Sequence, residues 1–498
     1  MLKKILRQAI SLLGLLIAAT PLSADNPDPF TPTADQPFAP SYITTVADHT
    51  KLTPDAWTDP KICGQCHVEQ YRGWNGSMHS NSFKDPVFQA EWALAVKATD
   101  GKFENHCAGC HSPIGTVTQS IKFDPSLGEH GGFTAPDIAA QGVTCDVCHT
   151  ISGTNITKTA VLEHGNASFV MDPGNVKRGP LDDANSPYHE TEESQHHKES
   201  KFCGNCHNIF HPVNNFPVER TYDEWKYSIY AQNGIQCQDC HMVTPEIAAK
   251  VADTLTRPKD MDEATLHGFA GLGGKYRKLV HRHGFTGGNA VITAALGEVD
   301  PEKYEDLGRN ENVEEAKARL RIAAELDAEL VKLNGSLHEL RVKVTNKRAG
   351  HNLPTSLTEV RQVWLEVVVT DNNGKELLRS GTLNKENELD SETVIFNARA
   401  VDKDGKITVN PWEIVRFIDN TTIPPRGHKI AKYPFNLPAD SLGVKISAKL
   451  HYRSFSQYLA DKLLGKGAVK VPSVEMVNLD QAFDTSKLEM HTAATVKF

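Results

Sequence analysis

The sequence lacks an excess of basic residues. Its 53 Lys and Arg stand against 62 Asp and Glu, so the 498-residue chain has a formal net charge of −9 at pH 7. An acidic chain is repelled by the phosphate backbone of nucleic acids, and we therefore exclude a nucleic-acid partner. The length is sufficient for two or three domains with cores of their own.

Long hydrophobic runs are also missing beyond the N-terminus. Lys3, Lys4 and Arg7 precede a short apolar run over residues 10–19, and small residues follow it. A basic start, a short apolar stretch and a small-residue cleavage site are typical of a signal peptide, and the stretch is short for a membrane span. We predict a signal peptide over residues 1–24, no transmembrane segment after its removal, and a periplasmic, extracellular or cell-surface location.

No cysteine stands outside a pair. The ten cysteines form five Cys-x-x-Cys pairs, each followed at once by histidine. We number them site 1 (Cys63, Cys66, His67), site 2 (Cys107, Cys110, His111), site 3 (Cys145, Cys148, His149), site 4 (Cys203, Cys206, His207) and site 5 (Cys237, Cys240, His241). Positions i, i+3 and i+4 share one face of a helical turn, so two thiols can bond one porphyrin while the histidine ligates its iron. Cys-x-x-Cys-His is the attachment signal of c-type haem, and we predict five haem c groups with these five proximal histidines.

Other uses of the cysteines explain the pattern less well. A zinc ribbon uses two Cys-x-x-Cys pairs for each metal, and five pairs is an odd number. Structural disulfides give no reason for identical spacing, and a redox dithiol needs one pair rather than five. Neither zinc nor a disulfide demands a histidine after every pair.

Methionine is scarce compared with histidine. The chain has 7 Met and 22 His, and 22 − 5 = 17 histidines remain after the proximal ones. Electron-transfer haems close the second axial position with histidine or methionine, so we predict mainly bis-histidine ligation and low potentials. We favour as distal ligands His79, His189, His283 and His351, with His106, His130 and His211 competing for the fifth position.

The patterning along the chain predicts an α+β protein. A Pro-rich leader over 25–60 precedes a pentahaem domain over 61–305, which includes the distal-ligand loops and should consist of short helices, long loops and little sheet. Apolar positions at helical spacing predict a connecting helix over 306–335. Alternating runs separated by "DNNG", "DKDG" and "PPRG" turns predict a β-sandwich-like domain over 336–453, followed by a C-terminal helix and tail over 454–498.

Several stretches resemble a known family. "CGQCHVEQYRGWNGSMHS", "GVTCDVCHT", "FCGNCHN" and "TYDEWKYSIYAQNGIQCQDCHM" resemble the multihaem cytochromes c typified by the tetrahaem cytochrome of nitrification, a group that includes octahaem hydroxylamine oxidoreductase-like proteins. "AGHNLPTSLTEVRQVWLEVVVTDNNG" resembles the β-domain that follows the haem region in many of them, with Ser356 where glycine is expected. The resemblance implies closely packed haem pairs, although five haems differ from the four of the type member.

Three functions fit this pattern. The first is electron transfer through five haems to redox partner proteins or extracellular acceptors, with no catalytic residue. The second is an oxidoreductase that acts on nitrite, hydroxylamine or a similar nitrogen or sulfur substrate at one five-coordinate haem, although no Cys-x-x-Cys-Lys motif is present. The third is a homo-oligomer or extracellular cytochrome filament in which histidines are donated between chains. We favour electron transfer over an enzyme.

Overall fold

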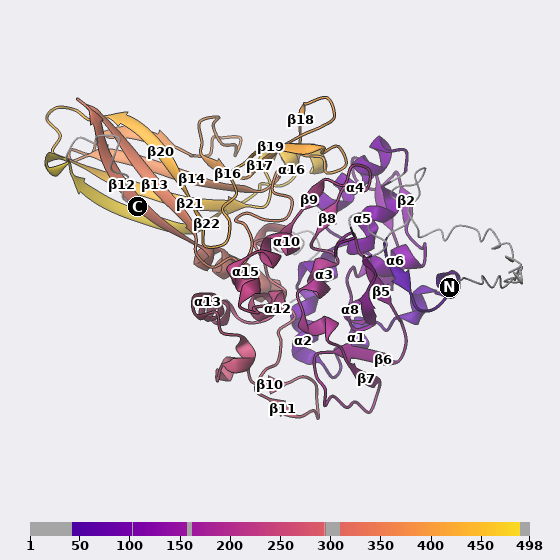
Figure 1. The fold of residues 1–498 in the computed structure, drawn as a ribbon. Helices are drawn as coiled ribbons and strands as arrows, with labels where there is room; N and C mark the ends of the chain where they lie inside the picture. The colour runs from indigo at the N-terminus through magenta and orange to yellow at the C-terminus, as the bar shows by residue number, and fades with distance from the viewer. Residues whose placement is uncertain (1–41, 102, 157–161, 293, 295–308, 489–498) are drawn as a thin grey trace, which may run out of the picture.

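Short helices carry the Cys-x-x-Cys-His motifs. The computed structural model describes residues 42–488 except 102, 157–161, 293 and 295–308, so the predicted signal peptide 1–24 and residues 25–41 of the predicted leader lie outside the described residues (Figure 1). The motif helices are α1 (Pro60–Cys63), α5 (Glu104–His111), α8 (Cys145–His149), α9 (Lys201–Gly204) and α12 (Cys237–His241). Side chains cap several of them: Asp59 accepts from the amide of Lys61, and Thr144 accepts from that of Val147. Each cap starts the helical turn on which the two cysteines of a motif lie on the same face.

Loops and minor elements connect the motif helices. The other helices here are α2 (Val68–Asn75), α3 (Met78–Asn81), α4 (Pro86–Ala98), α6 (Pro113–Val117), α7 (Asp137–Ala140), α10 (Thr221–Lys226), α11 (Ile229–Gln232) and α13 (Pro245–Thr254). The strands are β1 (Thr44–Thr45), β2 (Lys122–Asp124), β3 (Gly132–Thr134), β4 (Ile151–Thr154), β5 (Phe169–Met171), β6 (Val176–Gly179), β7 (Glu190–Glu193), β8 (Ile209–Phe210), β9 (Pro217–Glu219), β10 (Gly268–Phe269) and β11 (Tyr276–Arg277). These strands form sheets of only two or three members.

The C-terminal half is an antiparallel β-sandwich. One sheet has the order β12 (Ala324–Asn334), β13 (Leu337–Asn346), β20 (His428–Asn436); the other has the order β15 (Glu376–Ser380), β14 (Gln362–Asp371), β21 (Gly443–Arg453), β22 (Val474–Asp484), with β16 (Ile395–Phe396) beside β14. Leu340 and Val342 of the first sheet share one apolar core with Leu365 and Ala448 of the second. A third sheet joins β17 (Ala398–Val401), β18 (Ile407–Thr408) and β19 (Arg416–Asn420).

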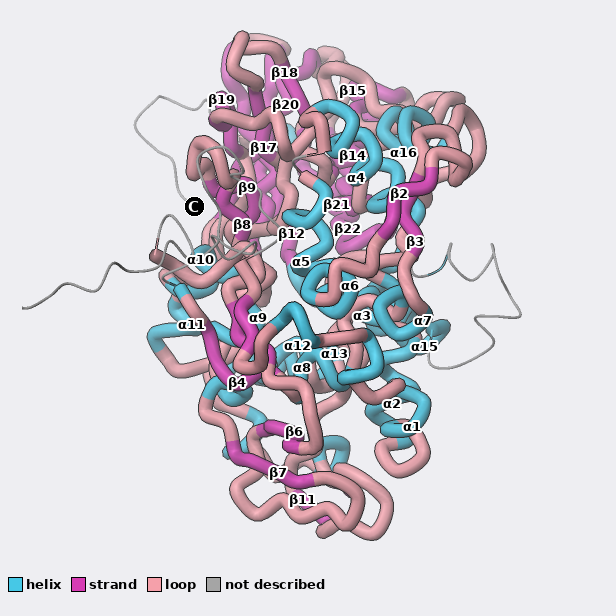
Figure 2. Tube along the Cα trace, turned by 90° about the vertical axis from the view of Figure 1, so that its right-hand side faces the viewer, coloured by secondary structure: helices cyan, strands magenta, loops and turns pink. Residues whose placement is uncertain are grey.

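The two regions lie side by side. The strands of the sandwich gather at one end of the molecule, and the short helices and loops gather at the other (Figure 2). Arg348 joins them through an ion pair with Asp253, 2.7 Å from Nη2 to Oδ2. Among the described residues, no helix is long and apolar enough to cross a membrane.

Two predicted boundaries differ from the structure. The predicted helix over 306–335 ends earlier, because α15 (Arg309–Ala323) gives way to β12 at Ala324. Leu326 and Leu330 fit a helical spacing, but their strand pairs over its whole length with β13. The predicted tail over 454–498 contains the expected helix, α16 (Gln457–Leu464), and also β22, which extends the sandwich beyond residue 453. In both places strand pairing, in a hairpin for β12 and with the distant β21 for β22, overrides the local pattern.

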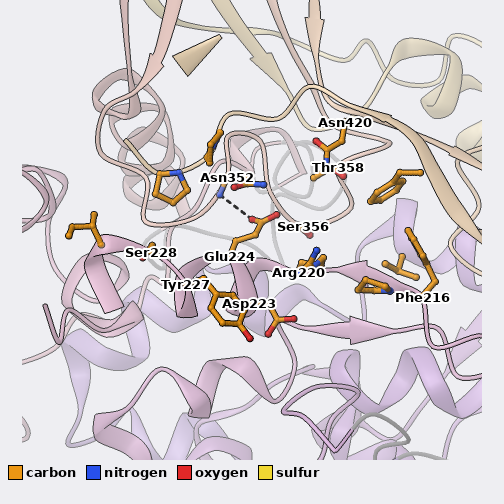
Figure 3. Close-up of a pocket in the computed structure, with 16 residues that line it drawn as sticks. Phe216, Arg220, Asp223, Glu224, Tyr227, Ser228, Asn352, Ser356, Thr358 and Asn420 are labelled. Carbon is orange, nitrogen blue, oxygen red and sulfur yellow. Dashed lines mark hydrogen bonds between the residues drawn. The ribbon is translucent and has the colours of Figure 1, made fainter. Parts of the chain in front are cut away.

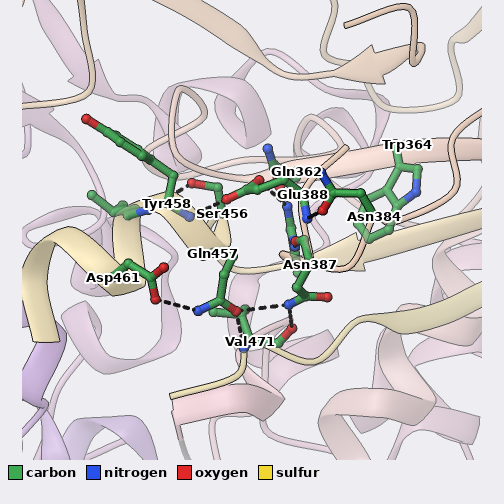
Figure 4. A network of polar contacts seen from close by, with 12 residues as sticks. Gln362, Trp364, Asn384, Asn387, Glu388, Ser456, Gln457, Tyr458, Asp461 and Val471 are labelled. Atoms are coloured by element: carbon green, nitrogen blue, oxygen red, sulfur yellow. Dashed lines mark hydrogen bonds and ion pairs between the residues drawn. The ribbon is translucent and has the colours of Figure 1, made fainter. Parts of the chain in front are cut away.

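A buried arginine organises the junction between β21 and α16. The Arg453 side chain is 0% exposed and donates to the carbonyl oxygen of Asn387, 2.7 Å away, and to the Glu388 carboxylate, 3.2 Å away. Asn387 in turn donates to Gln457 at the start of α16 (Figure 4). The network therefore ties a loop, a strand and a helix together through one cation.

Replacing Arg453 with alanine should destabilise the sandwich by about 1–3 kcal/mol, because the carbonyl oxygen of Asn387 loses its buried donor and the partly exposed Glu388 carboxylate loses its partner. Scanning calorimetry of the sandwich transition measures this effect. The matched control is Arg379→Ala, which breaks an exposed pair with Glu376 and should cost less than about 1 kcal/mol. Equal effects of the two changes would contradict the role given to the buried network.

Candidate haem sites

The region around the motifs is short of an apolar core of its own. Its buried hydrophobic side chains divide among several small clusters, whereas one large cluster fills the sandwich. All ten cysteines are free and half-buried, so none forms a disulfide. The small hydrophobic clusters leave room between them, and the cysteine pairs border that room. Large apolar groups bonded to the cysteines would fill it. The donor set therefore fits haem c.

The five motif histidines are held in one orientation by their Nδ1 atoms. Four of these atoms lie at hydrogen-bond distance from a backbone carbonyl oxygen: His67 from Ala270 (2.5 Å), His111 from Ser82 (3.0 Å), His149 from Arg178 (2.6 Å) and His241 from Thr286 (2.9 Å). A carbonyl only accepts, so Nδ1 carries the proton and Nε2 keeps its lone pair. This is the second-sphere contact expected of a metal-ligating histidine.

The fifth motif histidine has a carboxylate instead. Nδ1 of His207 lies 3.5 Å from Oε1 of Glu219, and the Glu219 side chain is only 8% exposed. Burial acts to lower the pKa of His207, but the bond to Glu219 and its charge raise it overall. Site 4 is thus the motif, among the described residues, whose histidine has a carboxylate rather than a carbonyl oxygen beside Nδ1.

Four motif histidines face a second histidine across a fixed gap. The ring centroids are separated by 6.4 Å in His67–His189, 6.2 Å in His207–His79, 6.4 Å in His149–His283 and 6.2 Å in His241–His351. Two imidazoles on one iron should have centroids about 6.4 Å apart, from two metal–nitrogen bonds of about 2.0 Å and about 1.2 Å from each nitrogen to its ring centre. All four predicted first-choice histidines therefore stand at the separation that one iron requires.

The second histidines are oriented like the first. Nδ1 lies 3.0 Å from the carbonyl oxygen of Glu190 in His189, 3.0 Å from that of His281 in His283 and 2.9 Å from that of Asn352 in His351. Their Nε2 atoms are again the ones left for a metal. Burial lowers the pKa of His79 and of His283 to about 3, so both rings are neutral at pH 7, as a ligand must be.

Of the three competing histidines, His106 and His211 line a cavity at site 2, and His130 does not. Nε2 of His130 is 2.9 Å from the carbonyl oxygen of Lys462, and Nε2 of His211 is 3.0 Å from that of Trp412. Nδ1 of His211 also accepts from the amide of Val213, so both of its nitrogens are used within the chain. His106 packs edge-on against Phe103 with centroids 5.5 Å apart.

Site 2 differs from the other sites on its open side. Among the described residues no histidine ring pairs with His111; instead the Phe88 ring stacks on it, 3.7 Å away and 5° from parallel. A cavity of about 130 Å³ adjoins the motif. Its walls include Cys107, Cys110, His111, His106, His211, Glu91, Leu357 and Trp412. The sequence contains no local sign of this difference, because its Cys-x-x-Cys-His motif is like the others.

Contacts between thiols connect the sites. Cys63 and Cys145 lie close enough for each thiol to shift the pKa of the other, which places site 1 beside site 3. At site 4, the thiol of Cys206 lies close enough to Cys110 of site 2 for Cys110 to raise its pKa, and Cys203 lies equally close to Cys237 of site 5. Cys148 of site 3 also acts electrostatically on both cysteines of site 4. Site 4 is therefore the junction of a connected cluster.

A larger surface cavity lies between the haem region and the sandwich. It encloses about 420 Å³ and is lined by Arg220, Asp223 and Glu224 from one side and by Asn352 from the other (Figure 3). The backbone amide of Asn352 donates to Glu224, 3.1 Å away, beside the His351 that faces site 5. Val218 borders both this cavity and the one at site 2.

Comparisons with known proteins agree with this geometry. The family model described as "Cytochrome c554 and c-prime" matches residues 62–150. The chain is similar to a solved penta-heme cytochrome c552 from Thermochromatium tepidum, with 18% identity and a TM-score of 0.57 over 86% of this chain and 100% of that one. A weaker match is MtrC from Shewanella baltica OS185, with 13% identity and a TM-score of 0.20 over 58% of this chain and 43% of that one. No curated protein matches the chain. The family match covers the motifs of sites 1, 2 and 3, and the similarity to the penta-heme cytochrome c552 extends to the fold of most of the chain.

Proposed function

We propose that the protein transfers electrons through five haem c groups outside the cytoplasmic membrane. Four facing histidine pairs at 6.2–6.4 Å carry this proposal, because closed axial positions suit electron transfer and exclude substrate from the iron. The ten cysteines would hold the groups covalently, and bound haem would supply reversible one-electron chemistry. The acidic chain, with a net charge of −9, suits a basic redox protein or a cationic extracellular acceptor as partner.

Site 2 supports a second candidate function. A motif histidine with no facing histidine among the described residues, beside a cavity of about 130 Å³, suits a five-coordinate iron that binds a small ligand. Reduction of nitrite, hydroxylamine or a similar small substrate would take place there. The filament alternative would require another chain to insert a histidine into the cavity at site 2. Leu357 and Trp412, which line this cavity, belong to the same chain.

Spectroscopy of the oxidised holo-protein tests both functions. Intact mass should show five covalent haems, and EPR with near-infrared MCD should show four low-spin bis-histidine centres and one high-spin centre. Carbon monoxide added after reduction should bind one haem in five. Fewer than five haems would contradict the cofactor assignment, and five low-spin centres in the monomer would eliminate the open site. His106→Ala is the control, since loss of a low-spin signal there would identify His106 as the missing ligand.

A further inference from the structure

A buried carboxyl group without a partner lies near site 2. The Glu359 residue is 7% exposed, and neither of its carboxyl oxygens has a hydrogen-bond partner among the described residues. It follows Leu357, which lines the site 2 cavity, and Thr358, which lines the surface cavity. An ionised carboxylate in such a place would lose its hydration without replacement, which is costly. Glu359 is therefore suited to hold a proton.

A second carboxyl group lines the site 2 cavity itself. Glu91 projects from α4 into the wall that also contains Cys107 and His111. Its charge acts on Glu359 and on the Cys107 thiol, so Glu91 lies near both groups. Two buried acids this close cannot both ionise easily, because like charges repel strongly in a low dielectric.

Few positive charges compensate the pair. Arg361 is the cation that acts on both, but its guanidinium donates to the carbonyl oxygen of Ser454, 2.8 Å away. Lys462 acts on Glu91 alone, and its Nζ donates to Asn410. The remaining neighbours are acidic: Asp85, which accepts from the amides that start α4, acts on Glu91, and Glu219, which faces His207, acts on Glu359.

The balance keeps protons on the pair near neutral pH. Burial is the main cause in both residues, and it raises the pKa of Glu91 to about 7 and that of Glu359 to about 8. Arg361 acts to lower the pKa of both residues, and the backbone of Glu359 itself acts to lower the pKa of Glu359. A purely structural role would suit a glutamine equally well. A titratable pair beside a redox site can instead respond to a change of charge.

We propose that Glu91 and Glu359 form a proton-binding site that is coupled to the redox state of site 2. When site 2 accepts one electron from a redox partner, its positive charge falls by one, and the pair takes up one proton from water at a carboxyl oxygen. Oxidation returns the electron to an acceptor and the proton to water, so charge and atoms balance. This inference rests on the proposed haem at site 2.

The sign of the expected pH dependence follows from the charges. Above a pH of about 7–8 the pair becomes more negative, which stabilises the oxidised, more positive form of site 2 and lowers its reduction potential. For one proton per electron, each tenfold fall in proton concentration lowers the potential by up to about 59 mV. Below pH 6 both groups stay protonated in the oxidised and the reduced protein, and the potential should be constant.

Redox titration of the holo-protein between pH 5 and 9 tests the proposal, with the high-spin absorption bands reporting site 2. Glu359→Gln and Glu91→Gln should each flatten the slope, whereas Glu475→Gln on the exposed face of β22 should keep it. A wild-type slope near zero, or the wild-type slope in both variants, would overturn the coupling.

A direct measurement protects the test against variants that fail to fold. Stoichiometric reduction of the wild-type protein in weak buffer with a pH indicator should show net proton uptake at pH 7.5 and none at pH 5. No uptake at either pH would overturn the coupling. Intact mass separates the two proposals: four haems instead of five would reject the haem at site 2, whereas five haems with a pH-independent potential would reject only the proton site.

Discussion

Replacing His283 with alanine converts site 3 from low spin to high spin, whereas replacing His197 leaves site 3 low spin. Both rings lie near His149: the centroid of His283 is 6.4 Å away and that of His197 is 5.9 Å away. Distance alone does not separate them, but hydrogen bonding does. Nε2 of His197 is 3.0 Å from the carbonyl oxygen of Cys148, whereas the ring of His283 uses Nδ1, 3.0 Å from the carbonyl oxygen of His281. Only His283 keeps Nε2 for a metal, as the motif histidines do, whereas His197 has Nδ1 left over.

EPR and near-infrared MCD of the oxidised variants measure this difference. In His283→Ala one low-spin signal should be replaced by a high-spin one, because the iron of site 3 loses a strong-field ligand. Added imidazole should restore the low-spin signal by entering the space that the side chain leaves. The opposite pattern, a high-spin centre in His197→Ala and none in His283→Ala, would reverse the assignment. Intact mass should show the same number of covalent haems in both variants as in the wild-type protein, since Cys145 and Cys148 remain.

The cysteine pattern carried most of the information about the sites. Five copies of one covalent motif indicate the cofactor and its proximal ligand without any three-dimensional knowledge, since the chemistry is local. The pairing of the second ligands is not local. His79 lies twelve residues after His67 in the chain, yet it faces His207, while His67 faces His189. Sequence proximity therefore gave the candidate histidines but not their partners.

The fifth position could not be predicted from the sequence for a related reason. His130 and His211 have the same side chain as the four paired histidines, and what removes them is a carbonyl oxygen far along the chain. The acceptors are Lys462 and Trp412, 332 and 201 residues away. The same holds for Glu359, whose unusual environment arises only when the sandwich packs against α4. Local patterns could predict neither contact.

Removing the cysteines of site 4 should divide the electron pathway, whereas removing those of site 1 should only shorten it. Site 4 contacts site 2 through Cys206 and site 5 through Cys203, and it lies beside Cys148 of site 3. Site 1 has one thiol contact, from Cys63 to Cys145. In the proposed function each motif holds its own haem, so both double variants, Cys203→Ala with Cys206→Ala and Cys63→Ala with Cys66→Ala, should retain four haems by intact mass.

Rapid-mixing reduction should separate the two variants. Without site 1, the four remaining haems stay in one connected cluster and should still equilibrate in a single fast phase. Without site 4, sites 2 and 5 lose the connection to sites 1 and 3, so the reduction should split into at least two phases with rates that differ by more than about tenfold, equivalent to about 1.4 kcal/mol in the barrier. Circular dichroism and the low-spin signal of His241–His351 control for misfolding. Identical kinetics in the two variants would show that sites 2 and 5 exchange electrons with site 3 directly, and the junction would then lie outside site 4.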